Sequence, residues 1–328
     1  MKSILRITAA VLMTVAMSFV ASGPARAATP EWLSVAAGAN HTCAIATSHA
    51  LYCWGNNLNG QLGLGDSLYR DIPRRVGTST SWTSVSLGDF HTCARHSSGR
   101  LYCWGANSDG QLGTGGPATD RTTPTRVGTS TNWTHVSLGQ RHTCARHTSG
   151  SLYCWGANSE GQLGLGHTTP RSTPTKVGTS TSWILVSAGD LHSCAKHTSG
   201  SLYCWGDNAY GQLGLGHLDD RSAPRKVGTS TSWASVSSSV EHTCARHNSG
   251  SVYCWGANGS GQLGLGDFDD RTSPRKVGNS TNWTTFATGG LHTCARHSTG
   301  SLYCWGYNDS GQLGLDDFAE RSTPTRIL

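Results

Sequence analysis

The feature that most constrains this chain is a repeat of about 50 residues that occurs six times. Each copy has a cysteine, a second cysteine ten residues later, and Trp-Gly directly after it. The spacing between copies is 50 residues, except for one step of 51 where the loop from Gly115 to Asp120 carries an additional residue. Self-similarity at this period is typical of solenoids and propellers.

Within one copy, the pattern predicts four short strands and no helix. In the third copy, alternating residues predict strands over 133–138, 141–147 and 151–156, with a turn over 148–150. A fourth strand is expected over 175–177, because Pro174 suits the start or edge of a strand. Four strands per copy is the number in a propeller blade, and 42 glycines with only 13% charged residues favour turns over long helices.

We therefore predict an all-β, six-bladed β-propeller with four-stranded blades. The expected repeats are 32–81, 82–132, 133–182, 183–232, 233–282 and 283–328. A single blade is too small to be stable alone, so each blade must pack against its neighbours. We expect the first and last blades to meet and close the ring, which would leave no exposed end.

The first 27 residues have the features of a signal peptide, which leaves 28–328 as a single propeller domain. Lys2 and Arg6 precede an apolar run from Ile7 to Val20, and small residues at Ala25 and Ala27 predict cleavage after Ala27. The run is shorter than the roughly 20 residues that cross a bilayer, so no membrane insertion is expected after cleavage. The sequence thus predicts a secreted or periplasmic protein.

The charge pattern argues against nucleic-acid binding. Cleavage would remove three basic residues and no acids, so the formal net charge would fall from +6 to +3. The remaining Lys and Arg, three or four per repeat, are interleaved with Asp and Glu, whereas phosphate binding needs clustered basic residues.

The repeated motif resembles a known family. The third copy has His142 and Cys144 in one predicted strand, Cys154-Trp-Gly in the next, then Asn158 and Gly161-Gln-Leu-Gly. The pattern Trp-Gly-x-Asn-x-x-Gly-Gln-Leu-Gly occurs in every copy and resembles the repeat of the regulator of chromosome condensation family. The resemblance implies a propeller whose loops bind macromolecules. It also implies two specific functions found among such proteins, guanine-nucleotide exchange and the inhibition of β-lactamases by an exported relative.

The register of the predicted hairpin places one disulfide in each blade. With a three-residue loop over 148–150, Cys144 faces Cys154 at a separation that a disulfide tolerates. An even count of twelve cysteines in an exported chain agrees. The expected bridges are Cys43 with Cys53, Cys93 with Cys103, Cys144 with Cys154, Cys194 with Cys204, Cys244 with Cys254, and Cys294 with Cys304.

A zinc site is the alternative for the same residues. His142, Cys144, His147 and Cys154 form a possible Cys2His2 set. However, His147 lies an odd number of residues from His142, so the two side chains point to opposite faces of a strand. The first copy also has Ala46 in place of this second histidine. We therefore predict neither a metal nor a cofactor, and keep metal binding as a minor alternative.

No residue pattern predicts an enzyme. A catalytic group is normally unique, whereas the first histidine of the motif recurs in all six copies. These histidines are expected to pack in the core or to support turns: His41, His91, His142, His192, His242 and His292. Asn158 and Gln162, by the same reasoning, are expected to hydrogen-bond backbone groups of the turns.

Binding specificity is expected where the copies differ. The residue before the repeated histidine, which we name the first belt, is Asn40, Phe90, Arg141, Leu191, Glu241 and Leu291. A second belt, after Trp-Gly and before the fourth strand, contains Tyr69, His167, Tyr210, His217, Phe268, Tyr307 and Phe318. Aromatic residues and Arg at variable loop positions are typical interface anchors.

We therefore predict a monomeric scaffold that binds a protein or another macromolecule through loops on one face. The alternatives are an extracellular inhibitor of the β-lactamase-inhibitor type, a regulator resembling guanine-nucleotide exchange factors, and a metal-binding repeat protein. Export disfavours the exchange factor.

Overall fold

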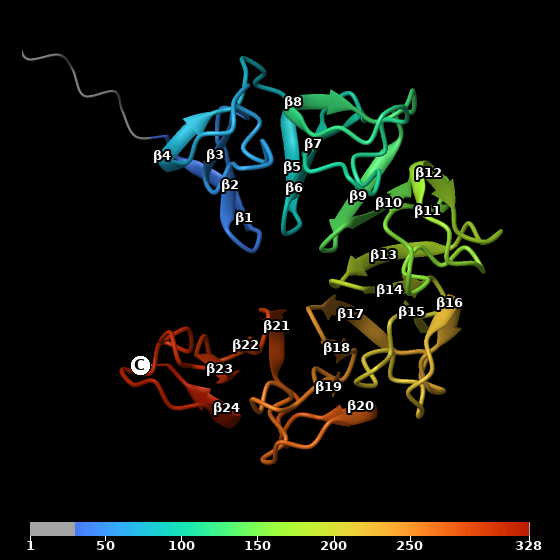
Figure 1. Ribbon diagram of the computed structural model, residues 1–328. Helices are drawn as coiled ribbons and strands as arrows, with labels where there is room; N and C mark the ends of the chain where they lie inside the picture. Colours follow the sequence, from blue (N-terminus) through green and yellow to red (C-terminus); the bar gives the residue numbers. More distant parts are fainter. Residues whose placement is uncertain (1–29, 328) are drawn as a thin grey trace, which may run out of the picture. The chain divides into compact units, whose positions relative to one another are not determined.

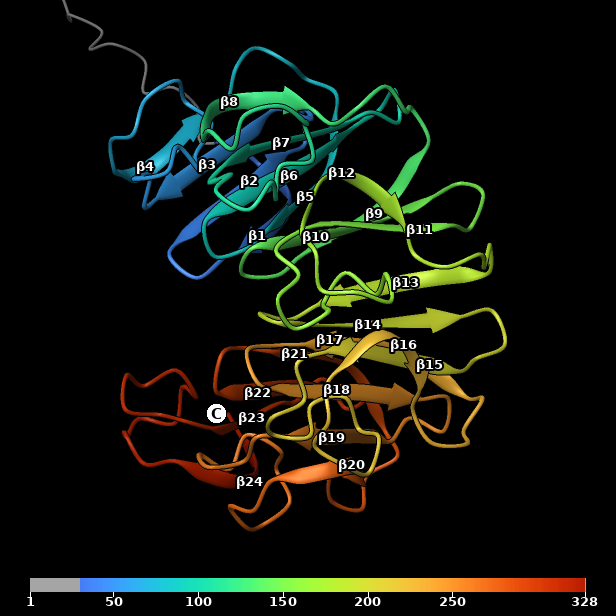
Figure 2. The same ribbon diagram turned by 45° about the vertical axis from the view of Figure 1, so that its right-hand side comes forward.

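Six four-stranded antiparallel sheets follow one another around an axis in the computed structural model, which describes residues 30–327 (Figures 1 and 2). Each sheet is formed by four consecutive strands, so no blade combines strands from both ends of the chain. The predicted signal peptide, residues 1–27, lies outside the described residues. Among the described residues, none forms a helix long and apolar enough to span a bilayer.

The strands of the first three blades are β1 (Trp32–Ala37), β2 (His41–Ala46), β3 (Leu51–Gly55), β4 (Arg70–Arg75), β5 (Trp82–Leu87), β6 (His91–His96), β7 (Leu101–Gly105), β8 (Arg121–Arg126), β9 (Trp133–Leu138), β10 (His142–His147), β11 (Leu152–Gly156) and β12 (Arg171–Lys176). Those of the last three are β13 (Trp183–Ala188), β14 (His192–His197), β15 (Leu202–Gly206), β16 (Arg221–Lys226), β17 (Trp233–Ser238), β18 (His242–His247), β19 (Val252–Gly256), β20 (Arg271–Lys276), β21 (Trp283–Thr288), β22 (His292–His297), β23 (Leu302–Gly306) and β24 (Arg321–Arg326).

The central hairpin of each blade has the predicted register. In the third blade, Cys144 pairs with Cys154 across β10 and β11, and the amide of His147 donates to the carbonyl of Ser151 across the three-residue loop. All six predicted disulfides are present, each joining residues whose Cα atoms lie 4.1 Å apart. The bridges also use the sulfurs that a Cys2His2 zinc site would need as thiolates, so that alternative is wrong.

The fourth strand is longer than the sequence predicted. In the third blade β12 begins at Arg171 rather than at 175, and Pro174 lies inside it instead of before it. The ladder between β11 and β12 skips from Thr175 to Arg171, so Pro174 lies in an irregularity where no ladder bond is required. Because β12 is an edge strand, it tolerates the missing amide hydrogen.

The joint between neighbouring blades uses the repeated motif. Between the second and third blades, the backbone carbonyl of Gln111 accepts hydrogen bonds from the Thr143 hydroxyl at 2.8 Å and from the Trp155 indole at 2.9 Å. The Nε2 atom of His91 lies 2.8 Å from the same hydroxyl. Since the hydroxyl hydrogen goes to Gln111, it is His91 that donates to Thr143, which places the imidazole proton on Nε2.

This joint recurs at all five junctions between consecutive blades. The carbonyls of Gln61, Gln162, Gln212 and Gln262 accept from Trp104, Trp205, Trp255 and Trp305, all at 2.9 Å. At Gly113 a Cβ atom would lie 2.5 Å from Trp155, so only glycine fits beside the indole. The repeated histidines are therefore packing residues, as the sequence predicted.

The ring does not close, contrary to our expectation. Within residues 30–327, the strand packing that joins consecutive blades is absent between the sixth blade and the first. Trp32 is 44% exposed, whereas its counterpart Trp82 is 4% exposed, and Leu302 is 44% exposed where Leu202 is fully buried. Because each joint is made by the same contacts, each turns the chain by a similar amount. Five such turns do not bring the end blades together.

The open joint predicts a difference in chemical reactivity. In hydroxyl-radical footprinting read by mass spectrometry, we expect Trp32 to be oxidised several times faster than Trp82, Trp133 or Trp183, since these three are buried by a preceding blade. Equal protection of Trp32 and Trp82 would mean that the first and sixth blades pack against each other in solution.

Candidate binding face

Both belts lie at the same end of the blades, which we name the variable face. The first belt occupies the loops between the first and second strands of each blade, and the second belt occupies the loops between the third and fourth. In an antiparallel sheet these connections lie at one end. Backbone hydrogen bonds of 2.9 Å tie the two loops together, for example from Ala106 to Phe90 and from Ala157 to Arg141.

The belt residues are accessible to a partner. In the first belt, Asn40, Arg141 and Leu291 are exposed, and the other three side chains are half-buried. In the second belt, Tyr69, Tyr210 and Phe268 are exposed and Tyr307 is half-buried. Arg141 lies 3.5 Å from Asp109 of the preceding blade, which links the two belts across a blade boundary.

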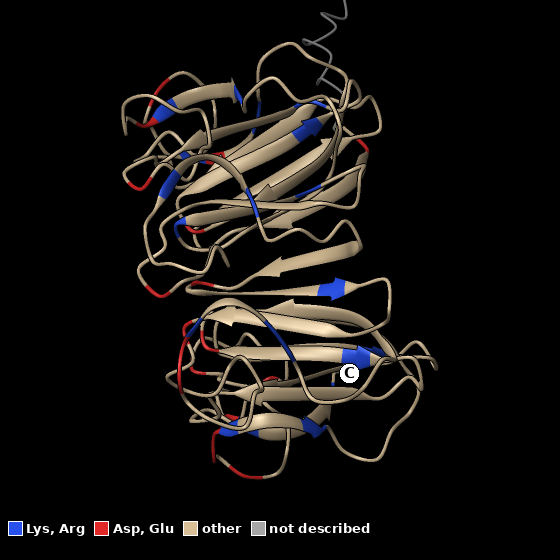
Figure 3. Cartoon of the chain, turned by 90° about the vertical axis from the view of Figure 1, so that its right-hand side faces the viewer, with Lys and Arg blue, Asp and Glu red and all other residues tan. Residues whose placement is uncertain are grey.

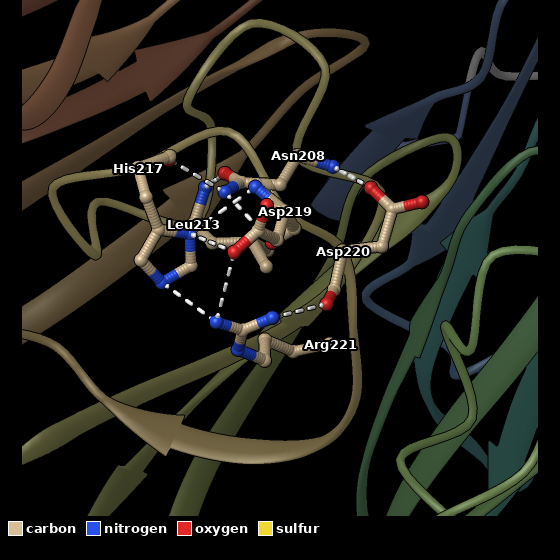
Figure 4. Close-up of polar contacts among 6 residues, drawn as sticks. All are labelled: Asn208, Leu213, His217, Asp219, Asp220 and Arg221. Atoms are coloured by element: carbon tan, nitrogen blue, oxygen red, sulfur yellow. Dashed lines mark hydrogen bonds and ion pairs between the residues drawn. The ribbon is translucent and has the colours of Figure 1, made fainter.

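The second-belt loops are held in place by the repeated asparagine, as Figure 4 shows for the fourth blade. The side-chain amide of Asn208 donates to the carbonyls of His217 and Asp219, and its oxygen accepts from the amide of Leu213 at 3.0 Å. The carboxylate of Asp220 accepts from the Asn208 backbone amide at 2.8 Å. These bonds confirm the predicted structural role of the asparagine, because they replace ladder bonds that the loop lacks.

A glutamine and an arginine that recur in every repeat form further bonds within the loop. In the third blade, Gln162 accepts from the backbone amide of Glu160 at 3.1 Å. In the fourth blade, Arg221 contacts His217 at 3.0 Å and Asp219 at 3.4 Å. The corresponding Arg271 in the fifth blade pairs with Asp267. The loops of the variable face are therefore held by Asn, Gln and Arg residues that occur in every copy, while other residues of the same loops vary.

A cavity of about 600 Å³ opens at the axis, where the loops of the first belt meet. Its wall consists mostly of small residues, among them Gly88, Gly139 and Gly189, together with Asp89 and Asp190. Burial, together with the nearby carboxylates of Asp89 and Glu241, raises the pKa of Asp190 to about 7. Burial also raises the pKa of Asp89, against an opposing hydrogen bond from Gln140.

Sequence reasoning missed these two carboxylates. Asp89 and Asp190 each lie directly before a first-belt residue, and the equivalent position in other copies holds Ala39, Gln140, Val240 or Gly290. The same variation that marked the first belt could have identified them. Their proximity, however, depends on the convergence of the loops at the axis.

Neutralising Asp190 should stabilise the fold at alkaline pH. Its folded-state pKa lies above the unfolded value of 3.8, so the folded protein loses stability as the pH rises through about 7. We expect Asp190→Asn to raise the Tm by several degrees at pH 8, with a gain that shrinks as the pH falls toward 5. Thermal melts at both pH values measure this, with the exposed Asp71→Asn as control. A Tm at pH 8 equal to that of the wild type would contradict the prediction.

The buried histidines do not have the properties of catalytic acids or bases at neutral pH. Burial lowers the pKa of His91, His192 and His242 to about 3, and that of His41 and His142 to about 4. Within the described residues, no cluster of three or more His, Cys, Asp or Glu side chains is arranged to hold a metal ion.

Comparison with known proteins supports this picture of the fold. The family model described as "Regulator of chromosome condensation (RCC1) repeat" matches residues 48–95, 98–146, 149–195, 199–246, 249–296 and 299–328. The ultraviolet-B receptor UVR8 of Arabidopsis thaliana is 34% identical over 136 residues, which are 40% of this chain and 31% of the receptor. The match thus spans less than a third of that relative.

Two solved structures share the fold. Human WBSCR16 has a TM-score of 0.81 at 23% identity, over 91% of this chain and 82% of its own. Yeast RCC1 (Prp20), solved bound to Kap60, has a TM-score of 0.78 at 21% identity, over 90% of this chain and 74% of its own. At this level of identity the two structures show the fold alone. The repeat match extends over most of the sequence, and the chain belongs to the family of proteins built from regulator of chromosome condensation (RCC1) repeats.

Proposed function

We propose that this protein is an exported scaffold that binds a protein partner through the variable face. The observation that carries the proposal is the distribution of variation. Side chains that differ between otherwise nearly identical repeats gather at one end of the blades, on loops that invariant Asn, Gln and Arg residues hold in place. Fixed loops lose little conformational entropy on binding, which favours recognition by their side chains.

Two further observations support a protein partner. Yeast RCC1, which shares this fold, was solved with Kap60 bound, so a protein that contains such a propeller binds another protein. The first belt combines Phe90, Leu191 and Leu291 with Arg141 and Glu241, a mixture of apolar and charged groups that is common at protein interfaces.

Export is supported by the six disulfides, since such bonds form and persist in oxidising compartments. Intact-mass analysis of the protein recovered from culture medium or periplasm tests this part of the proposal. We expect a chain that begins at Ala28 and contains no free thiol. Recovery of the full-length chain in the cytoplasm, with reactive thiols, would contradict export.

Partner binding can be tested with a triple variant of the first belt, Phe90→Ala, Arg141→Ala and Leu191→Ala. Surface substitutions cost little stability, so we expect the Tm to fall by no more than about 4 °C. The matched control is Thr129→Ala, Thr179→Ala and Thr229→Ala, which alters three exposed residues in the connections at the opposite end of the blades.

Affinity capture from culture medium and cell envelope then compares the three proteins. We expect a partner that is retained by the wild type and the threonine control and lost from the belt variant. Equal capture by all three proteins would show that binding does not use the first belt. Loss of the cooperative melting transition in the belt variant would show that these residues belong to the core.

A further inference from the structure

On the variable face, exposed apolar side chains occupy one equivalent loop position in three consecutive blades. Leu218, Phe268 and Phe318 occupy this position in the fourth, fifth and sixth blades and are 55%, 53% and 70% exposed. The first and third blades have the small polar residues Ser67 and Thr168 there. Single exposed apolar residues are ordinary, but three at equivalent positions of adjacent blades mark an interaction site.

The backbone beneath these side chains is fixed. In the fifth blade, the amide of Asn258 donates to the carbonyl of Asp267 at 3.0 Å, and Arg271 pairs with the Asp267 carboxylate. In the sixth blade, Asn308 donates to Asp317 at 2.9 Å, and Arg321 pairs with that carboxylate. The apolar residue follows the paired aspartate directly, so its position is set before any partner arrives.

Acidic residues surround the three apolar side chains. The loops 216–221, 266–271 and 316–321 together contain eight Asp or Glu residues and three Arg residues, which gives a net charge of −5. The equivalent loop of the third blade, 166–171, has a net charge of +1. Asp219 and Asp269, each one residue after an apolar side chain, are 75% and 84% exposed. Figure 3 shows most acidic residues at this end of the blades.

Further carboxylates belong to neighbouring loops of the variable face. Burial raises the pKa of Glu241, and the carboxylates of Asp207 and Asp270 raise it further. Burial likewise raises the pKa of Asp207, with contributions from Asp220 and Glu160. These carboxylates therefore lie close enough to repel one another, and a cationic partner would relieve the repulsion.

A hollow of about 660 Å³ lies beside the loop of the fifth blade. Asp267, Asp269 and Asp270 contribute to its lining, together with the basic residues Arg271, Arg275 and Lys276. It opens next to the loop that carries Phe268, so an apolar contact and an ionic contact can form within one footprint.

We propose that the loops of blades four to six form a docking site for a basic protein segment that carries apolar residues between its Lys or Arg residues. We name this site the acidic sector and define it by Leu218, Phe268, Phe318, Asp219, Asp269 and Glu320. The inference rests on the proposed function, and it adds the location and chemistry of the partner contact. Charge complementarity selects the partner, and the three apolar side chains fix its register.

Binding of two labelled synthetic peptides tests the proposal. One peptide has twelve residues of alternating Lys and Leu, and the other has Glu in place of Lys. By fluorescence anisotropy at low salt, we expect the basic peptide to bind and the acidic peptide not to bind. Binding should weaken strongly as the salt concentration is raised, because surface ion pairs are screened. Equal binding of both peptides would overturn the role of charge.

Matched variants separate the acidic sector from general electrostatic attraction. We expect Asp219→Asn with Asp269→Asn to weaken binding of the basic peptide about tenfold, since each exposed pair contributes under about 1 kcal/mol. The control, Asp71→Asn with Asp109→Asn, removes the same charge from the first and second blades and should change binding less than about twofold. Equal weakening by both pairs would overturn the proposal.

A triple variant, Leu218→Ser with Phe268→Ser and Phe318→Ser, tests the contribution of the apolar side chains to peptide binding. We expect at least a tenfold loss of binding with the salt dependence retained. Unchanged binding would overturn the assignment of these three residues. Sedimentation of the wild type provides a further check, because a dimer that these substitutions convert to a monomer would assign the sector to a second copy of the chain instead.

The result also distinguishes this inference from the proposed function. If the natural partner is lost from the first-belt variant but retained by both sector variants, the variable face binds protein without using the acidic sector. That outcome contradicts the inference and leaves the proposed function intact. Loss of the partner from the sector variants, with the peptide results above, supports both.

Discussion

Reduction of the six disulfides is expected to lower the Tm by about 15 °C. Each bridge joins cysteines ten residues apart, and closure of such a loop contributes roughly 2.5 to 3 kcal/mol in the chain-entropy model. Six bridges would contribute about 15 kcal/mol. We expect about half of this, because each hairpin keeps its two cysteines close together even without the bridge. At about 2 °C per kcal/mol for a domain of this size, the shift follows.

The experiment must expose the sulfurs first, since nearly all of them are fully buried. The protein is therefore reduced in denaturant, alkylated or kept reduced, and refolded before calorimetry. The pair Cys144→Ala and Cys154→Ala removes one bridge, and we expect it to cost about 1 to 1.5 kcal/mol, which is one sixth of the total. A refolded protein that titrates with twelve thiols and melts at the oxidised temperature would show that the blades do not need their bridges.

The fold within a blade could be predicted from the sequence because its determinants are local. Side chains alternate along strands with a period of two, and the three-residue loop over 148–150 fixes which residues face each other. The pairing of Cys144 with Cys154 follows from those two facts. The role of Asn158 in hydrogen-bonding the loop backbone could also be predicted, because Asn158 lies among glycines where backbone groups need partners.

What could not be predicted depends on contacts between blades. The angle between blades at the joint made by Gln111, Thr143 and Trp155 cannot be read from residue patterns, so the expected closure of the ring is wrong. The raised pKa of Asp190 arises because loops from different blades converge at the axis. The exposure of Leu218 was missed as well, since leucine at a loop position does not by itself indicate whether neighbouring blades cover it.

Two residues that depart from the repeat likewise have structural effects that the sequence alone does not predict. Ser239 replaces one of the glycines that line the axial cavity, and its hydroxyl forms a hydrogen bond with Nδ1 of His242 at 2.7 Å. Asp316 replaces another glycine and adopts a φ of 62°, a conformation that L-residues rarely take. The sequence marks both positions as unusual, but only the contacts show that one substitution adds a hydrogen bond and the other adopts a strained backbone.

The buried histidines make the propeller sensitive to acid, and the joint geometry gives the reason. His91 donates from Nε2 to Thr143, so a second proton must bind at Nδ1. The Nδ1 atoms of His41, His91, His142 and His192 have no hydrogen-bond partner among the described residues. A proton there would create an unpaired buried charge, which agrees with pKa values lowered to between about 3 and 4.

We therefore expect cooperative unfolding as the pH falls from 6 toward 4. The unfolded histidines bind protons below their ordinary pKa of about 6.5, while the folded ones stay neutral down to about 4, so stability is lost across this window. At pH 5 each of the five most shifted histidines favours the unfolded state by about 2 kcal/mol. The sum, about 10 kcal/mol, equals the stability of a typical domain.

Urea titrations at several pH values measure the protons taken up on unfolding. We expect a net uptake of about four near pH 5, because five histidines each take up about one proton and Asp190, whose folded pKa is about 7, releases one. His142→Gln should reduce the number by one, whereas Thr129→Ala, which replaces an exposed side chain at the opposite end of the blades, should leave it unchanged. An uptake near zero would mean that the histidines titrate equally in both states and that the joint accepts a charge that its geometry leaves without a partner.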